Sequence, residues 1–185
     1  MSGYCAYART SAVHAPYHDT EHGFPTDDTR VLFERLILEI NQAGLSWDLM
    51  LKKRAGFRKA YAGFDPAKVA RFGAEDTARL LADAGIVRNR LKVAAAIHNA
   101  AVILELARTH GSFAAWIAAN HPLTKAQWVK LFKKTFKFTG GEIVGEFLMS
   151  IGYLPGAHRD TCPTHRKILK TDPPWRRAAK AGFAF

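Results

Sequence analysis

The sequence predicts an all-α protein. Three observations lead to this class: apolar residues recur at helical spacing along most of the chain, the alternation typical of strands is almost absent, and Gly, Pro and Ser stand where helices would begin or end. A chain of 185 residues is long enough to bury a core in a single domain. We therefore expect one domain over residues 1–185, without internal repeats or low-complexity segments.

The N-terminal part of the chain combines an irregular arm with the first long helix. Residues 1–25 are rich in His, Tyr, Gly and Pro, and we expect them to be ordered but irregular. Thr26 or Asp27 then opens a helix with acids in its first turn. This helix ends at Ala43, because Gly44 is a typical helix-terminating residue.

Caps and breaks mark the later helices in the same way. Ser46 can cap the next helix, and Asp65 before Pro66 places a capping residue ahead of a proline in the first turn. The sequence therefore predicts further helices over 46–53 with a helical continuation to 61, and over 66–72, 74–85, 90–110, 112–119, 125–135 and 142–151.

Glu39 lies at the edge of the apolar face of the first long helix. At about 100° per residue it falls about 20° from Leu32, whereas Glu34 and Asn41 are expected to point away from the core. The helix stop then lets Glu39 and Trp47 meet at one corner, an anion beside an aromatic ring. A carboxylate at a buried edge loses hydration and therefore needs a partner. An ion pair with a nearby arginine and a bound ligand would both meet this need, and the sequence leaves both open.

Basic residues outnumber acidic ones, 27 Lys and Arg against 16 Asp and Glu, which gives a formal charge of +11. This balance favours a polyanionic partner, although many basic proteins bind no nucleic acid. The sequence has no run of about 18 apolar residues, so we expect no membrane span, and the first residues do not resemble a signal peptide. Two widely separated cysteines do not form a secreted disulfide framework, so we expect a cytoplasmic protein.

Three motifs in register carry a resemblance to a known family. They are E-x-x-Q-A-G-L-S-W at Glu39–Trp47, Y-H-D-T-E-H-G at Tyr17–Gly23, and Cys5 together with H-x-x-x-C at His158–Cys162. Over roughly residues 3–162 the chain resembles the 3-methyladenine DNA glycosylase I (Tag-type) family of the helix-hairpin-helix DNA glycosylase superfamily. The resemblance implies a helix-hairpin-helix glycosylase-like helical domain with a zinc-clipped subdomain formed by the two chain ends, residues 1–25 and about 152–165.

The resemblance also implies a base-binding site. Glu39 would be the catalytic residue and would accept hydrogen bonds from the base, and Tyr17, Trp47, Tyr7 and His22 would line the pocket. The alternative for Tyr17 is a core tyrosine bonded to a backbone carbonyl. The family usually has Trp where this chain has Tyr7 and His22. Because His22 is smaller and can gain a proton near neutral pH, base preference or rate would differ from the family norm.

Cys5, His18, His158 and Cys162 form a two-Cys, two-His set, which suits a closed tetrahedral zinc site. From the residues alone, free thiols rank above a metal site, because eight histidines produce many accidental spacings. A Cys5–Cys162 disulfide competes with both and is disfavoured in a reducing cytosol. The resemblance implies a structural Zn²⁺ at these four positions.

The predicted turn that begins at Gly85 resembles the hairpin of helix-hairpin-helix units, which aims backbone N–H groups at phosphate. Arg88, Arg90 and Lys92 would add cationic contacts to DNA, and Lys133 lies on a lysine-bearing helix that could follow a backbone. An ordinary αα-hairpin with solvated arginines is the alternative. The aromatics of the lysine-bearing helix fit a core better than a base-stacking surface.

These features predict a monomeric, monofunctional DNA repair enzyme. It would flip 3-methyladenine, or another N3-alkylated purine, out of double-stranded alkylated DNA, hydrolyse the glycosidic bond and release the free base, leaving an abasic site. No lysine occupies a motif position for a Schiff base, so we expect no strand cleavage. The alternative function is a non-catalytic, zinc-stabilised DNA-binding or damage-recognition module. The basic tail, 163–185, could lie on the body, touch DNA or be loose.

Overall fold

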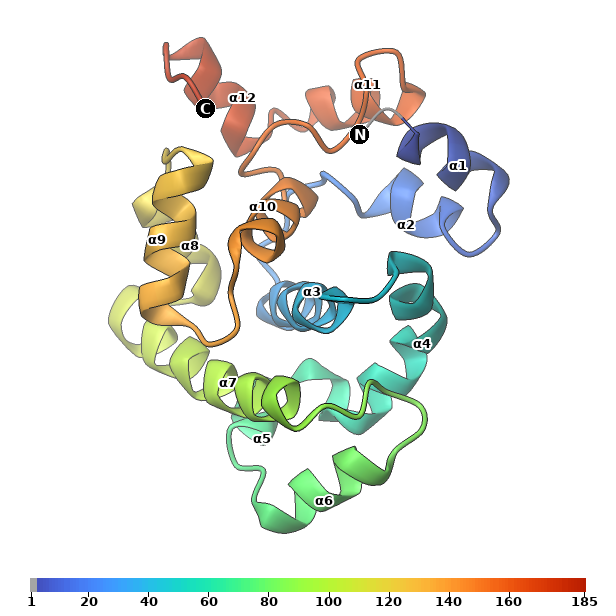
Figure 1. Cartoon of the computed structure of the whole chain (residues 1–185). Helices are drawn as coiled ribbons and strands as arrows, with labels where there is room; N and C mark the ends of the chain where they lie inside the picture. The colour runs from blue at the N-terminus through green and yellow to red at the C-terminus, as the bar shows by residue number, and fades with distance from the viewer. Residues whose placement is uncertain (1–2) are drawn as a thin grey trace.

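The computed structural model describes residues 3–185, and within that span it is entirely helical, without β-strands. This confirms the all-α prediction (Figure 1). None of the helices in the described part combines the length and apolar character needed to cross a bilayer. The elements, in chain order, are α1 (Tyr4–Thr10), α2 (Ala15–Thr20), α3 (Thr29–Gln42), α4 (Trp47–Ala60), the 3-10 helix η1 (Ala62–Phe64), α5 (Pro66–Val69), α6 (Ala74–Ala82), α7 (Arg90–His110), α8 (Phe113–Asn120), α9 (Lys125–Thr135), α10 (Gly141–Ser150), α11 (Pro163–Lys170) and α12 (Pro174–Lys180).

Helix α3 lies at the centre of the molecule, and Figure 1 looks almost along its axis, with α4, α7 and α10 around it. Every residue from Leu32 to Asn41 is buried, so α3 has no solvent-facing side in this stretch. The expectation that Glu34 and Asn41 point away from the core is therefore wrong. Glu34 is 3% exposed and pairs with Arg54 and Arg58 of α4, at 2.8 Å and 2.7 Å.

The N-terminal segment is not irregular, because it forms the two short helices α1 and α2. Helices of seven and six residues span less than the window in which apolar periodicity can be recognised, and such short helices depend on tertiary packing. Here α1 and α2 pack against each other, and α2 also contacts α11.

The C-terminal tail lies on the body, one of the three arrangements considered for it. It forms α11 and α12, which buries Ile168. The backbone N–H of Trp175 donates to the carbonyl oxygen of Gly152 at 3.1 Å, and a ring nitrogen of His121 lies 3.1 Å from the carbonyl oxygen of Pro174. As Figure 1 shows, α1, α11 and α12 lie on the same side of α3.

The other predicted helices occur where the sequence placed them, with shifted ends. Helix α9 has the predicted bounds, whereas α4 is one continuous helix and not two pieces. Helix α6 ends at Ala82, three residues before Gly85, because the backbone of Asp83 leaves the helical region. Its side chain then accepts a hydrogen bond from the N–H of Gly85 at 2.7 Å, which closes the turn into α7.

Candidate functional site

A cavity of about 240 Å³ lies where α3 and the first turn of α4 meet α1, α2, α10 and the loop that follows α10. It combines an apolar lining with a few polar side chains, the usual character of a small-ligand site. The residues that line it are Tyr4, Tyr17, His22, Glu39, Gln42, Trp47, Glu146, Met149, Gly156 and Ala157.

Glu39 is the most unusual polar group of this cavity. Its residue is 6% exposed, and its carboxyl has no hydrogen bond or ion pair with any described residue. Burial raises the pKa of Glu39 well above the usual range, the negative charge of Glu146 raises it further, and the positive charge of Arg35 opposes both. The acid of α3 that arginines neutralise is Glu34, so the ion-pair alternative does not hold for Glu39.

Two aromatic rings line the same cavity as this carboxyl. The rings of Tyr17 and Trp47 lie 5.2 Å apart at 55°, which brings two of the three Tag-type motifs together. The Tyr17 hydroxyl lies 3.4 Å from Nδ1 of His22 and not on a backbone carbonyl. Burial lowers the pKa of His22 to about 3, with help from the neighbouring His158 and Arg35, so the ring stays neutral near pH 7. This corrects the expectation that His22 gains a proton there.

Tyr7 does not line the cavity. It is 53% exposed, and its ring packs against His14 at 5.0 Å. Tyr4, three residues earlier on α1, takes the place expected for Tyr7. The expectation of an irregular segment could not distinguish Tyr4 from Tyr7, because the register of a helix decides which of two neighbouring tyrosines faces inward.

Sequence reasoning also missed two polar residues of the cavity. Gln42 was visible as the amide of the E-x-x-Q motif but received no role. Glu146 belongs to none of the motifs, and only the packing of α10 beside α3 shows that it faces the cavity.

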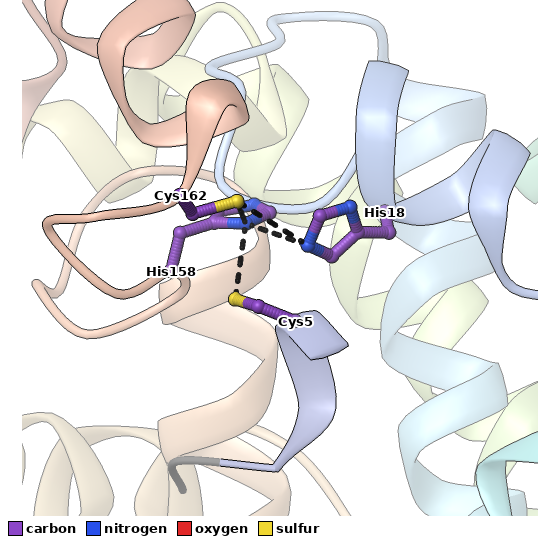
Figure 2. Close-up of side chains that lie close together, drawn as sticks. All are labelled: Cys5, His18, His158 and Cys162. Atoms are coloured by element: carbon purple, nitrogen blue, oxygen red, sulfur yellow. Dashed lines mark hydrogen bonds between the residues drawn. The ribbon is translucent and has the colours of Figure 1, made fainter. Parts of the chain in front are cut away.

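A second cluster joins the two chain ends. Cys5 of α1, His18 of α2, and His158 and Cys162 from the loop before α11 are all buried, and their donor atoms lie within 4.8 Å of one another (Figure 2). Nδ1 of His158 lies 3.7 Å from the sulfur of Cys5, 3.7 Å from that of Cys162 and 3.1 Å from Nε2 of His18. The two thiols are not joined in a disulfide. The cluster could therefore hold a metal ion.

The hydrogen bonds around this cluster orient both imidazoles. Nδ1 of His18 lies 2.7 Å from the Asp19 carboxylate, and Nε2 of His158 lies 2.7 Å from the carbonyl oxygen of His22. Since both of these oxygens accept, the ring nitrogens beside them donate, and Nε2 of His18 and Nδ1 of His158 point toward each other at 3.1 Å. Outer partners of this kind typically orient metal-bound histidines.

The turn between α6 and α7 presents cations to solvent. Arg88 in the turn and Arg90 at the start of α7 are exposed, and so is Lys133 on α9. None of the three has a side-chain hydrogen bond or ion pair within residues 3–185. Helix α4 contacts this turn, because Nζ of Lys53 donates to the carbonyl oxygen of Ala84 at 2.5 Å. A Cβ atom at Gly56 would lie 2.5 Å from the carbonyl oxygen of Gly85, so only glycine permits this close contact.

Lys92 does not belong to this exposed set. It is 5% exposed, and its Nζ donates to the carbonyl oxygens of Asn41 and Ala43 at 2.8 Å and 2.6 Å. The expected contact with DNA is therefore wrong for Lys92, because its ammonium is already bound at the end of α3.

The chain is similar in sequence and fold to proteins of one kind. A family model described as methyladenine glycosylase matches residues 7–129. DNA-3-methyladenine glycosylase 1 of Escherichia coli strain K12 is 36% identical, over 80% of this chain and 89% of its own. The DNA-3-methyladenine glycosylase of Haemophilus influenzae is 34% identical, over 88% of this chain and 98% of its own. A solved 3-methyladenine DNA glycosylase I of Staphylococcus aureus superposes with a TM-score of 0.79 at 32% identity, over 88% and 96% of the two chains.

Proposed function

The chain belongs to the methyladenine glycosylase family, and from this premise we propose how its residues excise 3-methyladenine from alkylated DNA. The reaction is hydrolysis of the bond between the modified base and its deoxyribose. The observation that carries the proposal is the buried carboxyl of Glu39, which has no hydrogen-bond or ion-pair partner within residues 3–185 and lines the same cavity as the rings of Tyr17 and Trp47.

Recognition uses the positive charge of the alkylated base. A base inside a duplex cannot reach the cavity, so it must first be flipped out. Stacking on Trp47 and Tyr17 then adds a cation–π contribution of about 0.5–2 kcal/mol. A cation beside Glu39 lowers the pKa of its carboxyl, which becomes a charged hydrogen-bond acceptor for the base. Unmodified adenine brings no charge and leaves Glu39 desolvated without a partner, which disfavours it.

The chemical step needs little assistance from the protein. N3-methylation leaves the purine cationic, so the electron pair of the C1′–N9 bond passes to the ring and the base departs neutral. Water adds to C1′ and loses a proton, which gives the abasic site. None of the described residues that line the cavity is a lysine, in line with a monofunctional enzyme that forms no Schiff base. Glu39 is the candidate catalytic residue because it contacts the departing base.

The metal cluster fits Zn²⁺. Zinc lies about 2.3 Å from thiolate sulfur and about 2.0–2.1 Å from imidazole nitrogen, so donor atoms of a tetrahedral site lie roughly 3.3–3.8 Å apart. Four of the six separations between donor atoms are 3.1–3.7 Å, close to this range, and all six are within 4.8 Å. When bound, the ion would supply structural cross-linking, since four protein ligands leave no position for water. Cys5, His18, His158 and Cys162 would hold it, which fixes Tyr17 beside His18. A reducing cytoplasm would keep both thiols available.

Duplex DNA would contact the α6–α7 turn around Gly85 and the exposed side chains of Arg88, Arg90 and Lys133. Contacts of this kind neutralise phosphate without reading sequence, which suits a repair enzyme whose lesions occur anywhere. One chain carries both the cavity and the cationic turn, so a monomer suffices for the reaction.

The test is single-turnover release of 3-methyladenine from a methylated duplex, with the abasic strand examined for breaks. Release with intact strands is the expected result. Duplex binding without release of the base would support the non-catalytic DNA-binding module instead.

A further inference from the structure

The base cavity contains a second carboxylate that belongs to none of the sequence motifs. Glu146 lies on α10, and Met149, nearly one turn further on, also lines the cavity. One face of α10 therefore points into the cavity. Glu39 approaches from α3, which packs against α10. The two acids belong to two different walls of the same site.

Glu146 has no cationic partner in the fold. Its carboxyl makes no hydrogen bond and no ion pair with any residue in the described span, although the residue is half-buried. Burial raises the pKa of Glu146, the nearby charge of Glu142 raises it further, and Lys125 opposes this only in part. Glu142 itself is exposed and pairs with Lys125 at 3.2 Å.

Two carboxylates that face one poorly solvated cavity without a cation destabilise each other. Each raises the free energy of ionising the other, as the effect of Glu146 on the pKa of Glu39 shows. Glu34 shows how this chain neutralises a buried acid that has a structural role, since two arginines bind it. Nothing comparable reaches Glu39 or Glu146 within residues 3–185, so their charge is neutralised either by protonation or by a cationic ligand in the cavity.

We propose that Glu146 is a specificity-determining residue, which together with Glu39 makes the cavity select purines that carry a positive charge. The inference rests on the proposed function and narrows its substrate class to bases that are cationic while still bound to the sugar, such as N3-alkylated purines. Glu39 would bind the base directly. Glu146 would stabilise its charge from the α10 wall, and a neutral base would gain nothing from that interaction.

The experiment compares two small probes of the same shape. One is the 3,9-dimethyladeninium cation, and the other is 3-deaza-3,9-dimethyladenine, in which carbon replaces ring nitrogen N3. Both are measured at a pH high enough to keep N1 of the deaza ring unprotonated, so that this probe is neutral. Their affinities are measured by calorimetry on the full chain. The variants are Glu146→Gln and Glu146→Met, which lack the charge, and Glu146→Asp, which keeps it. The matched control is Glu142→Gln, which removes an exposed carboxylate from the same helix.

Wild type should bind the cation more tightly than the neutral probe. Both neutral variants should reduce this preference about 3- to 10-fold, through weaker binding of the cation. Glu146→Asp should retain most of the preference, and Glu142→Gln should change it less than about 2-fold because its charge is screened by solvent. Having two neutral variants of different polarity keeps the test decisive if one of them folds poorly.

An unchanged preference in both neutral variants, or equal weakening of both probes, would overturn the role of Glu146. Release of 3-methyladenine from methylated duplex by wild type is measured in parallel. Failure of that release would overturn the proposed function, whereas release with an unchanged probe preference would overturn only the inference about Glu146.

Discussion

The Nζ atom of Lys92 lies 2.8 Å from the carbonyl oxygen of Asn41, so the first turn of α7 is bonded to the last turn of α3. A second bond to the carbonyl oxygen of Ala43, at 2.6 Å, satisfies another carbonyl that the end of the helix leaves open. Helix α7 follows the cationic turn, and α3 carries Glu39. This single side chain therefore links the helix that follows the proposed DNA-binding turn to the helix that carries Glu39.

Lys92→Met should destabilise the protein, by about 1–3 kcal/mol, because two carbonyl oxygens lose their donor in a buried position. It should also slow base release, since the corner between Glu39 and Trp47 loses its support. Chemical denaturation and single-turnover release measure the two effects. Lys133→Met is the control, an exposed lysine whose loss should leave stability unchanged. Wild-type stability of Lys92→Met would contradict the linking role.

Glu39→Gln should slow excision of 3-methyladenine roughly 10- to 100-fold, because a hydrogen bond to a charged acceptor contributes about 1.5–3 kcal/mol. Duplex binding should hardly change, because the cationic turn is untouched. Single-turnover release and binding to an unmodified duplex measure the two quantities. Excision at the wild-type rate by the folded variant would remove Glu39 from the mechanism.

The same variant should be more stable than wild type near neutral pH. Because folding raises the pKa of Glu39, the native protein keeps this proton after the unfolded chain has lost it. Wild type therefore loses stability as pH rises above the unfolded pKa of about 4.3, and Gln avoids that loss. Melting curves should show a gain at about pH 7 that shrinks toward about pH 4. Lower stability of the variant at neutral pH would indicate a structural ion pair instead.

Cys162→Ser should lower the melting temperature far more than it lowers activity per folded molecule, because the proposed zinc joins the chain ends away from the reacting bond. A strong chelator should have the same effect on wild type. His165→Gln serves as the control, since His165 lies nearby but outside the four-residue cluster. Elemental analysis that finds no zinc in the purified protein would exclude the proposal.

Arg88→Ala and Lys133→Ala should each weaken duplex binding to a similar extent on unrelated sequences. Each change should also reduce the slope of log affinity against log salt by about one unit, since one phosphate contact is lost. Arg108→Ala is the control, because Arg108 pairs with Glu105 near the far end of α7. Salt-independent binding, or a sharp sequence preference, would argue against this interface.

Local signals in the sequence were enough to predict the helical class and many of the helix ends. Ser46, Asp65 and Thr124 cap the first turns of α4, α5 and α9 with their own side chains, an interaction that spans two or three residues. The motifs likewise identified Tyr17 and Trp47, which both line the cavity. Helix caps can be predicted from the sequence because the donor and acceptor of a capping hydrogen bond are close together in the chain.

The tertiary structure decided which partner or cavity each polar side chain faces. Glu34, Glu39 and Glu146 are residues of the same type, yet arginines bind Glu34 whereas Glu39 and Glu146 line a cavity, because helices distant in the chain pack around α3. Lys92 meets Asn41 across 51 positions, and no local pattern encodes that contact. A side chain's partner depends on the packing of remote segments, whereas its tendency to begin or end a helix depends on its neighbours.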